Sequence, residues 1–206
     1  MDTLVHEHDN ILRMLDVLRA ASLRAMRGRP VNTDDLLRIE IFIRQYADKG
    51  HHGKEEDLLF PVMADELGEL GKSLFRHGML VEHDMGRLYV SDLHDAVTAY
   101  RTEPTDAAKL SILVAAGSYE RLLRRHIEKE NDVVFPFGGR NLSAEALAWL
   151  DEQTRVFEEN DKNAVKRKRQ LDVLEEMERK YRPEAVVQPV LPINGAALQN
   201  TLVSAE

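Results

Sequence analysis

Apolar residues recur every three or four positions in four long stretches within residues 1–140, a period typical of amphipathic helices. The strict alternation of apolar and polar residues that marks strands is hard to find in the same region. The four stretches cover about residues 2–26, 33–61, 73–101 and 105–136, and each ends at or near a glycine or a proline. The pattern predicts an all-α protein in which residues 1–140 form an up-down-up-down four-helix bundle.

A fifth helical stretch begins at a Ser143 cap and continues to about residue 181, but its middle, EENDKNAVKRKRQ, is polar on every face. We expect residues 141–182 to form one additional C-terminal helix. Residues 183–206 contain three prolines and no period, so we expect an irregular tail. The added helix should pack at two places, Trp149 with Leu150 and Leu171 with Leu174.

Charged and polar side chains interrupt the apolar stripes of the four bundle helices. Each stripe carries a histidine, and two of them also carry a glutamate at a position where the period calls for an apolar residue. A glutamate is almost never buried without a partner, because an unpaired buried carboxylate or imidazole costs several kcal/mol. The residues concerned are His8, His51, Glu55, His83, His126 and Glu130.

The chain contains an internal repeat in which His51 of the first copy corresponds to His126 of the second. The segment HHGKEEDLLFP at 51–61 aligns with HIEKENDVVFP at 126–136, and at the same offset EHD at 7–9 aligns with EHD at 82–84. Six of the eleven positions of the longer pair are identical, whereas Leu58 and Leu59 are answered by Val133 and Val134. The repeat therefore predicts two αα-hairpins, each with an EHD segment and an H-x-x-x-E pair.

The spacing of these residues points to a metal centre. Side chains four residues apart are neighbours on one helix face, so His51 with Glu55 and His126 with Glu130 can each grip a cation. His8 and His83 lie near the starts of their helices and should reach the same end of the bundle. Six donors then converge in one layer. The two cations of a dinuclear centre would neutralise the charge of its carboxylates. Taken singly, each histidine also fits an ordinary core position hydrogen-bonded to the backbone.

Neighbouring polar residues fit the stripe less well. His52, Glu56 and Glu128 lie one or two positions off it, and we expect them on the solvated face. His6, His77 and His94 have no counterpart in the other copy of the repeat and are expected at the surface or in ordinary core positions.

Composition narrows the classes of partner and ligand. The net charge is -8, which disfavours binding to nucleic acid or to anionic membranes, and we expect a cytoplasmic protein. Cysteine is absent, so nitrogen and oxygen atoms must supply any metal ligands. The basic run KRKR at 166–169 is flanked by acidic residues, which favours a salt-bridged, solvated turn over a nucleic-acid patch.

The chain resembles the hemerythrin-like proteins, or HHE cation-binding domains, over about residues 1–140. The resemblance rests on His8, HHGKEEDLLFP, VEHD with His83, and HIEKENDVVFP. The resemblance implies a four-helix bundle around two iron ions, bridged by the two glutamates and capped by the histidines. The residues that the resemblance assigns as metal ligands are His8, His51, Glu55, His83, His126 and Glu130. Oxygen-carrying members use a fifth histidine four residues before the third-helix ligand, and here that position is Met79.

The coordination count follows from this set of ligands. Two bridging carboxylates, four imidazoles and a shared oxo or hydroxo bridge leave two open positions on a pair of six-coordinate irons. Manganese and zinc are alternatives to iron. Tyr119 lies two turns before His126 on the same face, where it either packs in the core or borders a ligand pocket.

Several functions fit these features. The first is a diiron protein that binds or senses oxygen or related small oxidants such as nitric oxide or peroxide. Alternatives are a peroxidase- or catalase-like activity, iron storage or ferroxidase action, and a metal-free helical interaction module. Both a protein partner and a homo-oligomer stay open, because no separate output domain is visible in the sequence.

Overall fold

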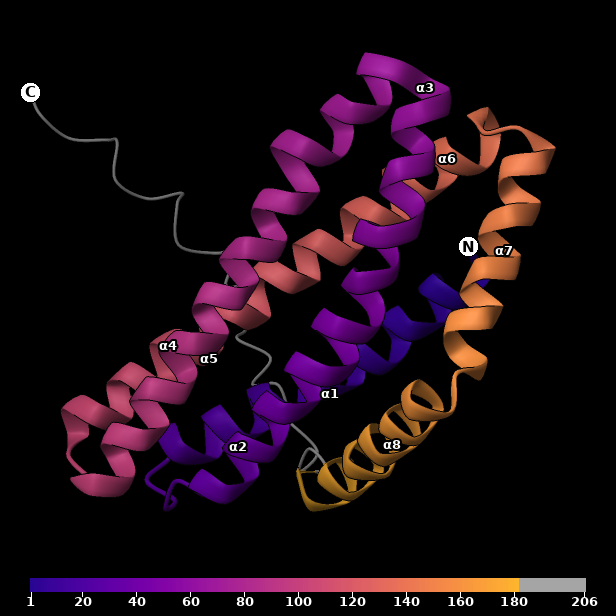
Figure 1. The fold of residues 1–206 in the computed structure, drawn as a ribbon. Helices are drawn as coiled ribbons and strands as arrows, with labels where there is room; N and C mark the ends of the chain where they lie inside the picture. Colours follow the sequence, from indigo (N-terminus) through magenta and orange to yellow (C-terminus); the bar gives the residue numbers. More distant parts are fainter. Residues whose placement is uncertain (182–206) are drawn as a thin grey trace, which may run out of the picture.

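The computed structural model describes residues 1–181, and every regular element in that part of the chain is helical (Figure 1). The predicted all-α class is confirmed. No helix of the described part combines the length and apolarity that crossing a bilayer requires. The α-helices and four π-helical segments, labelled η, are α1 Asp2–Met26, α2 Thr33–Phe42, η1 Ile43–His52, η2 Glu55–Leu59, α3 Phe60–Leu74, η3 Phe75–Met79, α4 Leu80–Thr102, α5 Asp106–Lys129, η4 Glu130–Val134, α6 Phe135–Asn141, α7 Ala144–Glu159 and α8 Asp161–Tyr181.

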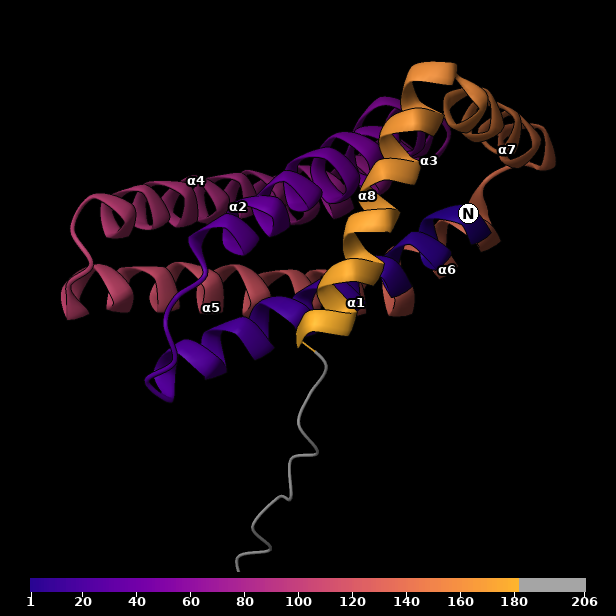
Figure 2. The same cartoon turned by 90° about the horizontal axis from the view of Figure 1, so that it is seen from below.

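Two apolar clusters fill the interior and leave a polar layer between them. The larger cluster includes Ile11 of α1, Ala47 of η1 and Ile127 of α5. The smaller cluster includes Leu4 of α1 and Leu59 of η2. His8 lies between Leu4 and Ile11 along α1, so its side chain falls where the two clusters meet. Residues of α1, η1, η2, α4, α5 and η4 form this layer, and α1, α2, α4 and α5 pack alongside one another (Figures 1 and 2).

Three of the four π-helical segments, η1, η2 and η4, occur where the two hairpins carry their H-x-x-x-E pairs. η2 and η4 occupy positions 55–59 and 130–134, which are matched positions of the repeat. η1 breaks the symmetry, because residues 118–127, its counterpart, are part of the α-helix α5. In a π-helix each hydrogen bond spans five residues, which changes the register of every side chain beyond it, and such segments are frequent at functional sites.

The structure corrects the predicted helix ends at Pro61 and Pro136. Both prolines are the second residue of a helix, α3 and α6 respectively, and the helical path continues through them. Proline is tolerated in a first helical turn, whose N–H groups have no partner four residues back. The chain reverses instead at Gly68, whose φ of 59° and ψ of -138° interrupt α3. Glycine adopts positive φ without the steric penalty of a side chain.

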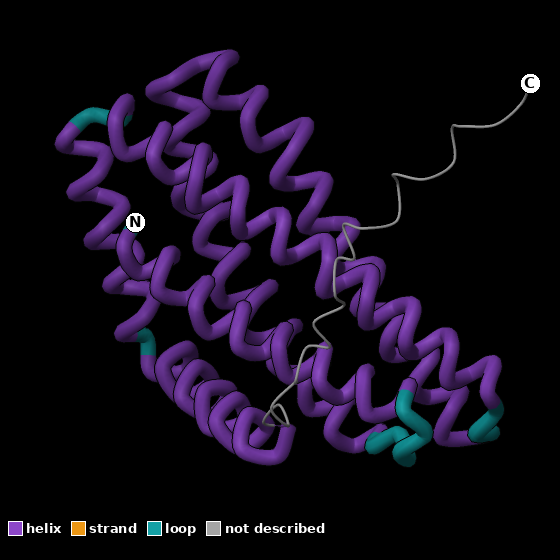
Figure 3. The backbone as a smooth tube through the Cα atoms, turned by 180° about the vertical axis from the view of Figure 1, so that it is seen from behind, coloured by secondary structure: helices purple, strands orange, loops and turns teal. Residues whose placement is uncertain are grey.

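The predicted single C-terminal helix is also wrong, because the chain breaks at Asn160 into α7 and α8 (Figure 3). The Asn160 side chain accepts from the backbone N–H of Lys162, which satisfies one of the first donors of α8. Leu150 and Leu174 are buried as expected, but Trp149 is 46% exposed. The tail predicted for residues 183–206 and the end of the helix at residue 182 lie outside the described residues.

Candidate metal centre

The structure brings the six predicted donors together and buries all of them. Each of these side chains belongs to a residue with a relative exposure of 1% or less. They come from several different helical segments and occupy the layer between the two apolar clusters. The residues are His8 of α1, His51 of η1, Glu55 of η2, His83 of α4, His126 of α5 and Glu130 of η4.

The four histidines form two pairs with their Nε2 atoms facing each other. Nε2 of His8 lies 2.8 Å from Nε2 of His51, and Nε2 of His83 lies 3.1 Å from Nε2 of His126. Adjacent ligands at right angles on an ion, each about 2.1 Å away, would be about 3 Å apart. The spacing within each pair is therefore the spacing of two nitrogens on one metal ion.

The two glutamates lie between the histidine pairs, and each carboxylate faces both. Glu130 places Oε2 3.2 Å from Nε2 of His8 and Oε1 3.0 Å from Nε2 of His126. Glu55 places Oε1 3.7 Å from Nε2 of His51 and Oε2 3.5 Å from Nε2 of His83. All four carboxylate oxygens are buried without a hydrogen-bond partner among the described residues. Such atoms are costly in a protein interior unless a cation neutralises them.

Outer hydrogen bonds orient the histidines. Nδ1 of His51 donates to Oε2 of Glu7 at 3.0 Å, and Nδ1 of His126 donates to Oε2 of Glu82, also at 3.0 Å. Because a carboxylate oxygen is an acceptor only, it places the proton on Nδ1 and leaves the Nε2 lone pair for a metal. Glu7 and Glu82 are the first residues of the two EHD segments, so the repeat extends to the residues behind the donors.

The other two histidines are held by the opposite hairpin. Nδ1 of His83 donates to Oε1 of Glu56 at 2.6 Å, and Nδ1 of His8 donates to Oδ1 of Asn131 at 2.8 Å. Glu56 and Asn131 are matched positions of the repeat. Each hairpin therefore orients one histidine of the other. The prediction that Glu56 is merely solvated is wrong, because the residue next to each glutamate donor reaches across the layer.

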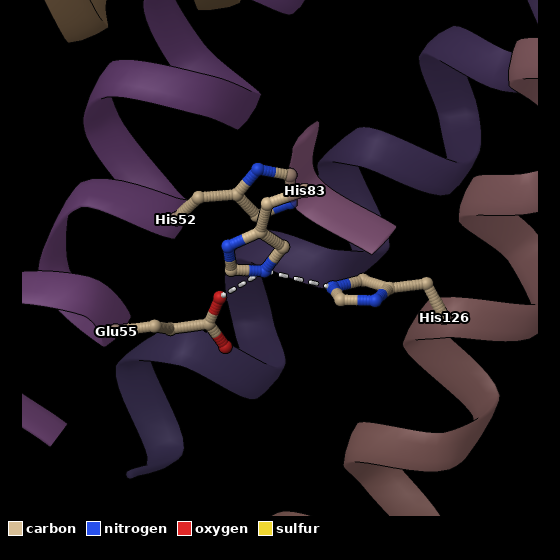
Figure 4. Close-up of side chains that lie close together, drawn as sticks. All are labelled: His52, Glu55, His83 and His126. Atoms are coloured by element: carbon tan, nitrogen blue, oxygen red, sulfur yellow. Dashed lines mark hydrogen bonds and ion pairs between the residues drawn. The ribbon is translucent and has the colours of Figure 1, made fainter. Parts of the chain in front are cut away.

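A fifth histidine joins this layer, contrary to the prediction that His52 is solvated. His52 is 4% exposed, and its ring stacks on that of His83 with centroids 3.9 Å apart and planes 9° apart (Figure 4). Neither ring nitrogen has a hydrogen-bond partner among the described residues. In the wider turn of η1, consecutive side chains rotate less about the axis, so His51 and His52 share the buried face. The matched residue in α5 is Ile127.

The donors make up two groups, each compact enough to hold one metal ion. The first contains His8, His51, Glu55 and Glu130, and the second contains His52, Glu55, His83 and His126. Within each group, one potential ligand atom per residue lies within 4.8 Å of all the others. The family model of the hemerythrin HHE cation binding domain matches residues 1–137. The chain belongs to the hemerythrin HHE family.

Neither the curated proteins nor the solved structures contain a match to this chain. Membership in the hemerythrin HHE family accounts for a cation site in residues 1–137, and the resemblance inferred from the two H-x-x-x-E pairs is confirmed. It also explains why so many ionisable groups are tolerated in the interior of this domain. A metal site turns a layer of costly polar atoms into a layer of ligands.

Without a metal, the ionisation of this HHE layer is uneven. Burial raises the pKa of Glu55 well above its usual range, and the nearby Glu130 raises it further. Burial acts in the same direction on Glu130, but the positive charge of His126 holds the pKa of Glu130 well below its usual range. Burial lowers the pKa of His126, whereas Glu130 raises it, with a net result of about 9. Burial lowers the pKa of His51 and of His52 well below the usual range.

Tyr119 lies beside the second donor group. It is 2% exposed and lines a cavity of about 20 Å³ together with His52, His83 and Gly86. A cavity of this volume holds about one water molecule. Burial raises the pKa of the Tyr119 phenol above its usual range, which keeps the hydroxyl protonated as a hydrogen-bond donor. Asp48 and Arg87 line the same cavity.

Proposed function

We propose that this HHE protein holds two metal ions, with iron as the resident metal, and that it binds or senses oxygen or a related small oxidant. The observation that carries the proposal is the placement of the two glutamates. Each turns one oxygen toward each histidine pair, and all four oxygens lack a partner among the described residues. Bridging carboxylates are the arrangement that uses every one of these atoms.

The ligands divide unevenly between the two ions. His8 and His51 would hold the first ion, and His52, His83 and His126 would hold the second, with Glu55 and Glu130 shared by both donor groups or next to both. On a pair of six-coordinate ions, five imidazoles, two shared carboxylates and one shared oxygen would leave one position for a small oxidant. The four-histidine set expected from the sequence would instead leave two positions open. The open position belongs to the ion that has only two histidines.

A mixed set of imidazole and carboxylate ligands suits iron, and such an iron centre supplies reversible binding or reduction of small oxidants. The chain itself orients the metal ligands and excludes water from the layer. Hydrogen bonds that the Nδ1 atoms donate to Glu7, Glu56, Glu82 and Asn131 fix the imidazole rings. Apolar clusters on both sides of the layer limit water, and Tyr119 borders a cavity of about 20 Å³ beside the second donor group. In this proposal α1, α2–η1, α4 and α5–η4 form the up-down-up-down bundle, and α7 and α8 are additions.

The test is an anaerobic titration of the metal-free protein with Fe(II), followed by visible and near-ultraviolet spectra while air is admitted. The expected result is saturation at two irons per chain and new charge-transfer absorption in air. Reversal of the absorption on degassing would favour binding, and its failure to reverse would favour turnover. Saturation at one iron would contradict the dinuclear assignment. Absence of iron, manganese and zinc uptake would leave the helical interaction module as the function.

A further inference from the structure

The residues behind the two donor groups differ in charge. Glu56 orients His83 of the second group, whereas its counterpart in the repeat, Asn131, orients His8 of the first. A half-buried carboxylate is stabilised by a nearby cation, whereas a neutral amide needs none. Glu56 has such a cation in Arg87.

Arg87 of α4 holds Glu56 at the edge of the metal layer. Its Nη2 atom donates to Oε1 of Glu56 at 2.6 Å, and the same oxygen accepts from Nδ1 of His83, also at 2.6 Å. Nε2 of His83 points the other way, toward His126 and Glu55 (Figure 4). The guanidinium of Arg87 is therefore separated from a metal donor by a single carboxylate.

Two further carboxylates fix the guanidinium itself. Nε of Arg87 donates to Oδ1 of Asp48 at 2.8 Å, and Nη1 donates to Oδ1 of Asp84 at 3.0 Å. Because a guanidinium is planar and donates in fixed directions, it holds its acceptors in one arrangement. The side chain of Arg87 is 38% exposed, so this arrangement lies where the metal layer meets solvent.

Three of the four members of this charged group have uncharged counterparts in the repeat. Arg87 corresponds to Leu12, Asp48 to Leu123 and Glu56 to Asn131. The fourth member, Asp84, corresponds to Asp9, whose side chain is 69% exposed. Leu123 belongs to the larger apolar cluster, and Leu12 packs against it. The charged arrangement therefore supports the second donor group, and apolar packing takes its place at the matched site.

We propose that Arg87 is a positioning residue for the second metal ion. By holding Glu56 against Nδ1 of His83, it fixes the imidazole ring with Nε2 toward the ion. The side chain of Glu56 is 27% exposed, so the carboxylate can turn toward water once Arg87 is removed. Without their cation, Glu56 and Asp48 would also repel one another. Arg87 acts on the ion through Glu56 and does not itself touch it.

The proposal rests on the proposed function, because that function assigns His83 to a metal ion, but its first test needs no metal. Proton–nitrogen NMR spectra of the metal-free full chain distinguish an imidazole protonated at Nδ1 from one protonated at Nε2. We expect His83 to be protonated at Nδ1 in the unmodified protein and to become a mixture of both tautomers in Arg87→Ala. An Arg87→Ala variant whose His83 tautomer is unchanged overturns the proposal.

Arg124→Ala is the matched control. Arg124 also joins two helices through two carboxylates, Glu120 and Asp16, and its side chain is 30% exposed. Neither carboxylate is hydrogen-bonded to a metal donor within the described part of the chain. The control should therefore lose an ion-pair network of similar size and keep the His83 tautomer. A tautomer change of equal size in Arg124→Ala would assign the effect to general destabilisation and overturn the proposal.

A second test titrates the metal-free protein with Zn(II), a diamagnetic probe, and follows the ring nitrogens of His83 and His8. Arg87→Ala should weaken binding at His83 by about 10-fold and leave binding at His8 largely unchanged, because Asn131 orients His8. Equal losses at both histidines would overturn the proposal. Saturation of both histidines by a single zinc ion per chain would contradict the dinuclear centre, and the tautomer would still decide the role of Arg87.

A double-mutant cycle separates positioning from packing. Glu56→Ala should weaken zinc binding at His83 by at least about 10-fold, and the addition of Arg87→Ala should cause little further loss, since Arg87 acts through Glu56. Losses that multiply in the double variant would overturn the proposal. Circular dichroism checks the folding of each variant. Arg87→Gln keeps part of the side chain and removes the charge, and it replaces Arg87→Ala in every comparison if that variant does not fold.

Discussion

Oε2 of Glu7 lies 3.0 Å from Nδ1 of His51, while the other oxygen of the same carboxylate accepts from the ammonium of Lys54. Glu82 has the same two contacts in the second copy of the repeat, with His126 and Lys129. The repeat is therefore preserved in a chain of three residues: a lysine, a glutamate and a histidine that faces the metal layer. The glutamate is the member that fixes the ring.

Glu7→Ala should reduce metal affinity by about 10- to 100-fold, because the imidazole of His51 loses the acceptor that sets its orientation and tautomer. Isothermal titration with Fe(II) under anaerobic conditions measures the change. Asp9→Ala is the control, since Asp9 is in the same helix with a side chain 69% exposed. Equal affinities for the two variants would show that Glu7 has no part in orienting His51.

Lys54→Met should destabilise the protein by roughly 3 to 5 kcal/mol, which corresponds to a fall in melting temperature on the order of 10 °C. Lys54 is 1% exposed, and its ammonium lies between Glu7 and Glu158, so the substitution leaves the buried Glu7 carboxylate without its cation, while Glu158 keeps its ion pair with Arg167. The repeat provides the matched control. Lys129 makes the equivalent contact with a side chain 51% exposed, and Lys129→Met should cost about 1 kcal/mol or less. Thermal denaturation of both variants decides the point.

His52→Ala should weaken the second metal ion by at least about 10-fold and leave the first ion largely unaffected. His52 belongs to the donor group with Glu55, His83 and His126, and its removal takes one imidazole from that ion only. Stepwise titration and the spectrum of the loaded protein report the two ions separately. His77→Ala, at an exposed position, is the control. Identical titration curves for His52→Ala and the unmodified protein would make His52 a packing residue.

The sequence was sufficient to predict the helical class and the convergence of the donors, because both depend on spacing that ordinary helix geometry preserves. His51 with Glu55 and His126 with Glu130 are close in any helix of the right register. The repeat strengthened the prediction, because the same spacing of a histidine and a glutamate occurs in both copies. The α-helical period also placed His8 and His83 on their apolar stripes.

His52 could not be found in the same way, because its burial depends on the π-helical register of η1. The usual period of 3.6 residues turns two consecutive histidines to different faces, and local sequence gives no clear sign of the wider turn. The ends predicted at Pro61 and Pro136 were wrong for a related reason, because each proline lies in the first turn of a helix that directly continues a π-helical segment. The break at Asn160 lies in a stretch without an apolar stripe, where periodicity carries no information.

Glu55→Gln should make the metal-free protein more stable and abolish its stabilisation by metal. Both carboxylate oxygens of Glu55 are buried without a partner among the described residues, so a neutral amide of the same shape reduces the desolvation cost by about 1 to 3 kcal/mol. The unmodified protein should instead gain about 4 kcal/mol at a metal concentration a thousand times the dissociation constant. Melting temperatures with metal and with chelator measure both effects. A variant that is less stable than the unmodified protein in chelator would show that Glu55 has a structural partner.

The hydrogen bonds that His8 donates to Asn131 and His83 donates to Glu56 cross between the hairpins in opposite directions. Neither half of the duplicated chain therefore contains a self-sufficient clamp, and separately produced halves would have to associate before either could retain a cation. Each half of the repeat therefore depends on one residue of the other half to orient a histidine. A substitution at position 56 or 131 therefore changes the hydrogen bond that orients a histidine of the other copy, and its effect appears in the half of the repeat that does not carry it.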